Sequence, residues 1–419
     1  MQLTIDSKQL PVGWKIKKLV EVTDLITCGV AKRPDYVDDG IPFLSARNVK
    51  NGHVIWDNYK YISEETHAEL TKNNKPRKGD ILYTRVGSFG EAAIIDDDFE
   101  FSIFVSLTLI KTKTEILNSF LKYYLNSYSV KILAKNSISG SGVGNLNVGT
   151  VRNFFVPLPP LPEQKRIVAI LDEAFEGIDR AIANTEKNLA NARELFESYL
   201  NAIFTQKGDE WVEKTLKQVS VDFGRGRSRH RPRNDKKLYG GKYPFIQTGD
   251  IRNSNHVVTC YSQTYNEVGL AQSKLWPKGT VCITIAANIA ETGVLNFEAC
   301  IPDSIIGLVV DENSANNMFA EYMLQAFKLF LKAKGKGSAQ DNINMGTFEA
   351  QKFPFPSIDE QEKIVEKLDF LSTETQRLEA LYRQKLVALN ELKQSILQKA
   401  FTGELTADTS KTVKEMIAA

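Results

Sequence analysis

The chain has 419 residues, of which 42% are hydrophobic and 25% are charged, a balance typical of folded domains and not of a disordered chain. Its formal net charge of +2 excludes a polybasic, histone-like binder but leaves room for local basic patches. No apolar run reaches the length of a membrane span and the first residues lack a signal-peptide pattern, so we expect a cytoplasmic protein.

Strands and a helix are predicted along the first half in the order strand, strand, helix. Residues 81–84 and 104–110 are strand-like, and residues 118–133 have a helical pattern. A linker rich in proline, residues 157–162, is followed by a long helical pattern over residues 163–204. The second half repeats this order with strands over 281–285 and 305–310, a helix over 316–334, a Pro354–Pro356 linker and a long helix over 360–401.

An internal repeat at an offset of 197 residues explains this similarity. The matched identities include Asn145/Asn342, Asn147/Asn344, Gly149/Gly346, Pro157/Pro354, Glu163/Glu360, Gln164/Gln361, Ile167/Ile364, Leu171/Leu368 and Asp172/Asp369. Trp14 and Trp211 share the offset, but between the tryptophans and this block the match is weak. Each half is therefore a variable region followed by a constant one, and we infer that the variable regions perform two versions of one task.

The two long helices are predicted to form a coiled coil with one another. Apolar residues recur at heptad spacing in both copies, among them Ile167, Leu171, Ile178 and Leu195 in the first and Ile364, Leu368, Leu371, Leu378 and Leu392 in the second. A helix of about 42 residues is about 60 Å long, and one with a single apolar stripe needs a partner. The alternative is two unrelated amphipathic core helices.

Motifs for catalysis are missing. The sequence contains no P-loop, no dinucleotide-binding fingerprint and no D/N-P-P-Y tetrapeptide of an amino-methylating enzyme, and Pro302-Asp303 lacks a nearby E-x-K nuclease pattern. Cys28, Cys260, Cys282 and Cys300 form no C-x-x-C pair, so we interpret them as small core residues. We assign no catalytic residue and no metal ligand, and we predict a binding or scaffold protein.

Candidate DNA-binding residues occur in both variable regions. A basic arm carries Arg225, Arg227, Arg229, Arg231, Arg233 and Lys236, and the first half has Lys32 and Arg33 at the equivalent distance after its tryptophan. Polar residues that can read base edges follow a Pro-Phe pair in each half, namely Arg47 and Asn48 in the first and Gln247 and Asp250 in the second. Arg85 and Asn288 lie at matching strand ends, and Lys336 is a candidate phosphate contact. The alternative for each is an ordinary solvated position.

Two segments resemble one known family. Residues 157–168, Pro-Leu-Pro-Pro-Leu-Pro-Glu-Gln-Lys-Arg-Ile-Val, resemble the hallmark of the specificity subunit of type I restriction–modification systems, and residues 392–405 resemble the ending of many members. The resemblance covers about residues 10–407. Residues 357–359, Ser-Ile-Asp, depart from the expected lead-in but leave Glu360 and Gln361 intact.

The resemblance implies an α+β fold with two similar α/β target-recognition domains, separated by two long antiparallel coiled-coil helices with pseudo-two-fold symmetry. The implied boundaries are 1–158 and 207–356 for the recognition domains, 159–206 and 357–405 for the helices, and 406–419 for a tail. Glu163, Gln164, Glu360 and Gln361 then join the heptad residues as helix or partner contacts.

The resemblance also implies the function. Each domain would read one half of a split DNA target, and the helices would set the gap and dock two modification subunits that methylate adenine N6. S-adenosylmethionine, ATP and Mg²⁺ would belong to the modification and restriction subunits, because this chain would be non-catalytic. Two alternatives stay open: an enzyme with fused recognition halves, and a coiled-coil DNA-binding or scaffold protein with no restriction–modification role.

Overall fold

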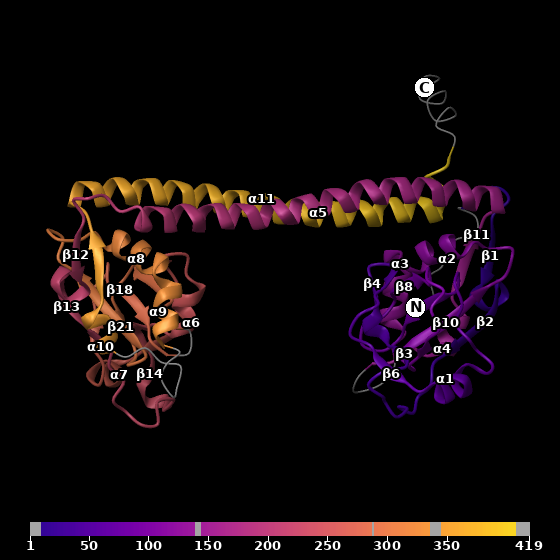
Figure 1. Cartoon of the computed structure of the whole chain (residues 1–419), viewed down its shortest axis with the longest axis horizontal. Coiled ribbons are helices and arrows are strands. Elements are labelled where there is room, and N and C mark those ends of the chain that lie inside the picture. The colour runs from indigo at the N-terminus through magenta and orange to yellow at the C-terminus, as the bar shows by residue number, and fades with distance from the viewer. Residues whose placement is uncertain (1–9, 139–143, 287–288, 336–344, 408–419) are drawn as a thin grey trace, which may run out of the picture. The chain divides into compact units, whose positions relative to one another are not determined.

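The computed structural model describes residues 10–138, 144–286, 289–335 and 345–407 (Figure 1). The chain divides into two compact units: the first combines Met1–Thr185 with Gln384–Ala419, and the second comprises Glu186–Arg383. This division differs from the predicted boundaries near residues 158 and 356. Each unit includes one α/β domain together with half of each long helix, because the helices pack onto the domains.

The first unit is built on an antiparallel sheet with the strand order β2-β10-β7-β8, and β6-β3-β9, β4-β5 and β1-β11 form smaller sheets. Its strands are β1 (Lys15–Lys18), β2 (Thr23–Cys28), β3 (Ile41–Leu44), β4 (Val49–Lys50), β5 (His53–Val54), β6 (Lys60–Ile62), β7 (Ile81–Thr84), β8 (Ala92–Ile94), β9 (Ser102–Ile103), β10 (Leu107–Thr112) and β11 (Phe155–Leu158). Its short helices are α1 (Glu64–Thr71), α2 (Asn118–Leu125), α3 (Tyr128–Asn136) and α4 (Val148–Arg152), and α5 (Leu161–Thr205) begins in it.

The second unit repeats this plan with the sheet order β13-β21-β18-β19-β15, beside β16-β14-β20-β17 and β12-β22. Its strands are β12 (Val212–Thr215), β13 (Ser220–Arg225), β14 (Tyr239–Phe245), β15 (Val257–Val258), β16 (Gln263–Tyr265), β17 (Leu275–Trp276), β18 (Val281–Thr284), β19 (Thr292–Leu295), β20 (Ala299–Cys300), β21 (Ile305–Val310) and β22 (Lys352–Phe355). Its helices are α6 (Thr248–Asn253), α7 (Glu267–Ala271), α8 (Asn317–Ala326), α9 (Lys328–Gly335) and α10 (Met345–Ala350), and α11 (Ile358–Thr402) begins in it.

The predicted strands are observed at 81–84 and 305–310, and β18 ends one residue earlier than predicted. The strand predicted over 104–110 begins only at Leu107, because the Leu107 amide donates to the Phe104 carbonyl in a turn.

The two predicted helices 118–133 and 316–334 are each split, after Leu125 and after Ala326. At the first break the Asn126 side chain bonds both the amide and the carbonyl of Ala92 on β8, which turns the chain back over the sheet.

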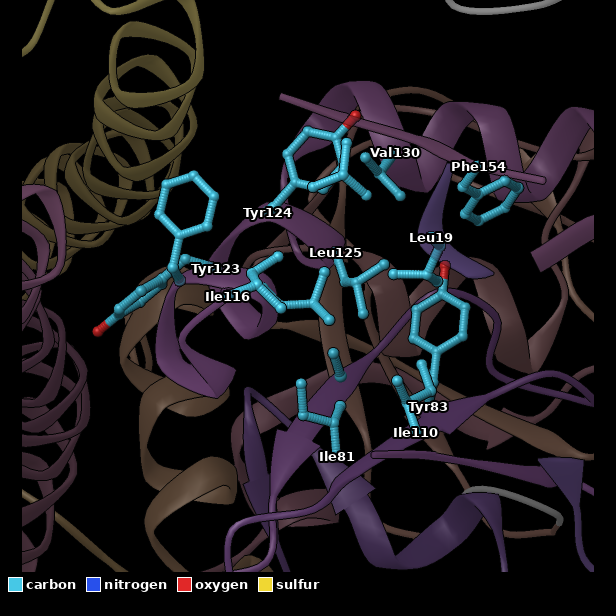
Figure 2. Packing of buried hydrophobic residues seen from close by; sticks show 14 of the residues in the cluster. Leu19, Ile81, Tyr83, Ile110, Ile116, Tyr123, Tyr124, Leu125, Val130 and Phe154 are labelled. Carbon is cyan, nitrogen blue, oxygen red and sulfur yellow. The ribbon is translucent and has the colours of Figure 1, made fainter. Parts of the chain in front are cut away.

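Apolar side chains from the sheet and from α2 form the core of the first unit. Ile81, Tyr83 and Ile110 of β7 and β10 pack with Leu19 and Leu125, as Figure 2 shows. The same cluster continues into the long helices through Ile167 and Leu171 of α5 and Leu397, Ala400 and Phe401 of α11. The second unit has a matching cluster that includes Leu200 and Phe204 of α5 and Leu368 of α11. Burial of these side chains fixes each domain to its helix segments.

The helix segments are antiparallel within each unit. In the first unit Asp179 pairs with Lys393, and Glu163 accepts a hydrogen bond from Thr406, just beyond the end of α11. In the second, Arg193 donates to Glu379 at 2.8 and 2.9 Å, and Lys367 lies 5.0 Å from the Tyr199 ring. Partner numbers fall on α11 as they rise on α5, which confirms the antiparallel pairing.

The strict heptad assignment is partly wrong. Ile167, Leu171, Ile178 and Leu368 are buried and Ile364 and Leu371 are half-buried, but Leu195, Leu378 and Leu392 are exposed by 72%, 39% and 47%. Phe196 and Leu200 pack on the second core in place of Leu195. An α-helix has 3.6 residues per turn, so a straight helix drifts by about 20° per heptad away from a strict 3.5-residue repeat.

Two glutamines of the repeat, Gln164 and Gln361, join the α/β domain of each unit to its long helix. Both are fully buried. Gln164 Oε1 accepts from the Leu117 amide at 2.8 Å, and Gln361 Oε1 accepts from the Asn316 amide at 2.9 Å. Their amide groups donate to the Pro159 and Pro356 carbonyls. Each of these bonds lies inside one unit, and the contact of either glutamine with a partner subunit stays a prediction.

Glu163 and Glu360 are also occupied by contacts within the chain. Besides the bond from Thr406 to Glu163, the Trp211 indole donates to Glu360 at 3.0 Å. A second repeated contact lies nearby: Tyr123 donates to Asp172, and Tyr322 donates to Asp369 at 2.7 Å.

Two further sequence expectations concern the cysteines and membrane spans. Cys282 and Cys300 are buried as predicted, but Cys28 is half-buried and Cys260 is exposed. In the described part of the chain, no helix combines the length and the apolarity that a membrane span needs.

Candidate nucleic-acid interface

A short helical turn follows the Pro-Phe strand in each unit. In the first unit this turn is η3 (Ala46–Asn48), where the Asn48 side chain accepts from the Ser45 amide at 3.0 Å. In the second it is α6, where the Asp250 carboxylate accepts from the Gln247 amide at 2.8 Å. These reciprocal capping boxes hold the turn by local bonds, so the residues around it can differ between the units.

A hollow beside this turn in the first unit has cationic walls. It has a volume of about 460 Å³ and is lined by residues that include Arg47, Lys50, Asn51, Gly87 and Glu91. Arg47 and Lys50 are exposed, whereas Glu91 pairs with Lys131. The hollow therefore offers hydrogen-bond donors with positive charge, which suit phosphate oxygens or the O6 and N7 acceptors of guanine. We call it the first-unit hollow.

A hollow beside the corresponding turn in the second unit has neutral and acidic walls. It has a volume of about 580 Å³ and is lined by Asp250, Asn253, Ser254, Asn255, Val257, Val258, Thr259, Cys260, Tyr261 and Ser262. Asn253 and Asn255 are exposed, and an amide can both donate to and accept from a base edge. We call it the second-unit hollow.

The basic arm of the second unit is partly neutralised by one acid, Asp303. Arg233 donates to its carboxylate at 2.7 Å, and Arg231 lies 3.8 Å from the same oxygen. Arg225 donates to the Asp303 backbone carbonyl. These contacts hold the base of the arm against the loop between β20 and β21.

The middle of the arm carries the exposed arginines Arg227 and Arg229. The Gln272 side chain accepts from the Arg229 and His230 amides, and Ser273 donates to the Arg227 carbonyl. Their backbone is therefore fixed, while neither guanidinium has an acidic partner within 4.0 Å among the described residues. His230 pairs with Asp235 at 2.9 Å. A backbone bond from Lys237 and then the bond from His230 lower the pKa of the Asp235 carboxyl.

Two predicted DNA contacts are buried supports instead. Asn48 is only 2% exposed, and its amide donates to the Ile55 and Asp57 carbonyls. Arg85 is 5% exposed and donates to the Leu146 and Val105 carbonyls at 2.8 and 2.9 Å. The prediction that these two side chains contact DNA directly is therefore wrong. Asn48 holds the wall of the first-unit hollow, and Arg85 ties the end of β7 to neighbouring loops.

The other predicted contacts are distributed over both units. Lys32, Arg33, Arg47 and Lys236 are exposed, and Gln247 and Asp250 are half-buried. Asp250 also accepts a hydrogen bond from Ser262 at 3.1 Å, so one of its carboxylate oxygens is already used within the unit. Asn288 and Lys336 lie outside the described residues. The structure therefore gathers Arg47 with Lys50 in one hollow and the arm residues on one loop, and their contacts with DNA stay predictions.

Lys50, Asn253 and Asn255 are not among the candidate DNA contacts predicted from the sequence. The sequence offers one indication of them: they follow the two Pro-Phe pairs, whose offset marks corresponding turns in the two units. Which neighbours form a hollow depends on loops far away in sequence, such as that of Gly87, so the linings could not be read from either turn alone. The described residues contain no group of three His, Cys, Asp or Glu side chains suited to a metal ion.

Comparison with known proteins assigns the family. The model for the type I restriction modification DNA specificity domain matches twice, over residues 11–190 and 208–387. The chain belongs to this family. It is a DNA sequence-specificity subunit, as its resemblance implied, and the alternative of a coiled-coil scaffold without a restriction–modification role is not favoured.

Similar proteins cover nearly the whole chain. A putative type I restriction enzyme specificity subunit of Methanocaldococcus jannaschii is 21% identical over 96% of both chains. The EcoKI specificity subunit of Escherichia coli K12 is 21% identical over 95% of this chain and 90% of its own length. The fold is similar to one chain in a study of complex assembly in a type I restriction–modification system, with a TM-score of 0.75 at 21% identity over 94% of this chain and 99% of that one. It is also similar to the HsdS subunit from Thermoanaerobacter tengcongensis, with a TM-score of 0.58 at 21% identity over 96% of this chain and 100% of that one.

Proposed function

We propose that each unit reads one half of a split, asymmetric DNA target and that α5 and α11 set the unspecified gap between the halves. The observation that carries this proposal is the pair of hollows. They adjoin corresponding turns held by the same capping box, yet one is lined by Arg47 and Lys50 and the other by Asn253 and Asn255. The turn is held in the same way in both units, while the residues that line the hollow differ. Two domains that bind different DNA sequences need such an arrangement.

The basic arm would supply affinity. Arginines that contact phosphates bind duplex of any sequence and orient the reader, whereas base contacts select the sequence. Arg227 and Arg229 are exposed on a backbone that is already fixed. Little backbone flexibility would therefore be lost when DNA binds them.

The long helices would dock two modification subunits. Large apolar side chains are exposed on them, namely Leu195 on α5 and Phe370, Leu381, Val387 and Leu392 on α11. Exposed apolar patches are typical of protein interfaces. Leu378, which the heptad pattern placed in the coiled coil, is also exposed and joins this group.

Catalysis would belong to the partner subunits. The sequence has neither the methyltransferase tetrapeptide nor a P-loop. We therefore propose that S-adenosylmethionine binds in the modification subunits, which methylate adenine N6, and that ATP and Mg²⁺ serve restriction subunits that translocate and cleave DNA. The target adenine would leave the base stack to be methylated.

The test is to express this chain with its modification subunit in a methylation-free host and to map N6-methyladenine across the genome. We expect a split motif with a fixed gap and one modified adenine per half, on opposite strands. A continuous motif would contradict two separate readers. Methylation by this chain alone would contradict a non-catalytic role, and no methylation by a demonstrably assembled complex would contradict the proposal as a whole.

A further inference from the structure

A half-buried histidine, His256, immediately precedes the strand β15 that walls the second-unit hollow. Its Nδ1 lies 2.7 Å from the carboxylate of Glu321, which is completely buried on α8. The other oxygen of Glu321 accepts from Thr292 at 2.8 Å. Asn255 and Val257, the neighbours of His256 in sequence, both line the hollow. A pair formed by a half-buried histidine and a fully buried acid therefore anchors the lining of a candidate recognition site.

The backbone at His256 has a conformation that most side chains rarely adopt. Its φ is +61°, a left-handed conformation that favours glycine. The corresponding position of the first unit, just before β5, is Gly52 with a φ of +80°. Glu321 likewise corresponds to Lys122, since Tyr322 and Tyr123 make the same bond to a long helix. The acid–base pair belongs to the second unit alone.

The pair also connects the hollow to the long helices within this unit. The His256 ring lies 4.6 Å from the Tyr322 ring and 6.1 Å from the Phe196 ring of α5. Tyr322 in turn donates to Asp369 of α11. The titratable groups facing His256 are therefore Glu321 and Tyr322 on α8 and Asp369 on α11, while α5 contributes Phe196 and β19 contributes Thr292.

The sign of the pH dependence follows from these neighbours. Burial lowers the pKa of the His256 imidazole, but the hydrogen bond to Glu321 and the charges of Glu321 and Asp369 outweigh it, so the pKa is raised. A raised pKa means that the pair stabilises the fold fully below about pH 6.5, the ordinary value, and that this contribution is lost as pH rises through the raised pKa. Above it, a neutral ring leaves the buried Glu321 carboxylate without its cation.

We propose that His256 is a positioning residue of the second unit: held by Glu321, it fixes the segment 254–262 and makes this unit bind its half of the target more tightly at low pH than at high pH. The structural part stands by itself, whereas the effect on DNA rests on the proposed function.

Cys260 offers a direct probe because it is exposed and lines the hollow. An environment-sensitive fluorophore is attached to Cys260 of the full chain in a Cys28→Ser background and followed from pH 5.5 to 9. We expect a transition with a midpoint above pH 6.5 that is absent in His256→Gly/Glu321→Gln, which gives position 256 the glycine of the first unit and removes the buried charge. His230→Gln is the matched control and should keep the transition. A transition that survives the double substitution, or its absence in the parent, overturns the proposal.

The DNA effect is measured on the assembled complex with a duplex carrying the mapped split motif. Each half is scrambled in turn, and competition binding is compared at pH 6.5 and 8.5. We expect the preference of the second unit for its intact half-site over the scrambled one to fall roughly threefold to tenfold from pH 6.5 to pH 8.5. The preference of the first unit should change little, and in the double variant the preference of the second unit should not depend on pH. If discrimination changes equally with pH for both half-sites, the proposal that His256 controls binding by the second unit is overturned. If scrambling either half has no effect at any pH, the proposed function itself fails, while the Cys260 probe still decides the structural part.

Discussion

Single arginines within the basic arm have different surroundings, and this decides which should contact DNA. Arg231 and Arg233 face Asp303, whereas Arg227 and Arg229 have no such acid within reach in the described chain. We predict that Arg227→Ser/Arg229→Ser weakens binding to duplex of any sequence and lowers the slope of log K against log salt by about 2, since each lost phosphate contact removes about 0.9. The measurement is a titration across a salt series.

Lys217→Ser/Lys278→Ser removes the same charge from exposed positions of the same unit and serves as the control. An equal loss of slope in both variants would show that only overall charge matters and that the arm makes no specific phosphate contact.

The buried glutamines have consequences for stability at the same scale. Replacing Gln361 with Ala removes bonds to Asn316, Pro356 and Ser314 and leaves their backbone groups unpaired. We predict a loss of about 2 to 4 kcal/mol in the free energy of unfolding of the second unit, measured by denaturant titration. Gln398→Ala at an exposed position of the same helix should change stability by less than about 0.5 kcal/mol. Similar losses of unfolding free energy in the two variants would contradict a special stabilising role of the buried Gln361.

The long helices are the elements that should control the gap in the target. A heptad adds about 10.5 Å of helix and nearly two whole turns, so the buried stripe keeps its direction to within about 20°. We predict that inserting one heptad after Thr185 and one after Arg383 lengthens the gap by about three base pairs and leaves both half-site sequences unchanged. Mapping of N6-methyladenine checks this. Changed half-sites with an unchanged gap would contradict a spacer role for the helices.

At the scale of the whole molecule, the last part of the chain completes the first unit. Phe401 of α11 packs 5.3 Å from the Phe120 ring and 5.1 Å from the Tyr124 ring, and Leu397 is almost fully buried beside them. We predict that a chain ending at Arg383 loses the cooperative unfolding of the first unit although residues 1–185 are intact. Loss of one buried phenylalanine costs about 3 to 5 kcal/mol, so Phe401→Ala should give a milder version of the same defect.

Supplying residues 384–407 as a separate peptide should restore protection of the first unit from proteolysis. A truncated chain whose first unit resists proteases as well as the full chain does would show that the core closes without α11.

Sequence alone determined the two-fold repetition, the long helices and the family, because these depend on local pattern: periodicity, proline-marked boundaries and identities at a constant offset. It also placed the turns after Pro42-Phe43 and Pro244-Phe245 in corresponding positions. Only the tertiary structure decided which polar residues face outward. Some polar residues of types that commonly form binding sites lie inside the fold, namely Asn48, Arg85, Gln164 and Gln361. Their side chains form hydrogen bonds with backbone groups instead, some of them distant in sequence. The same dependence on distant neighbours hid the His256–Glu321 pair, whose members are 65 residues apart.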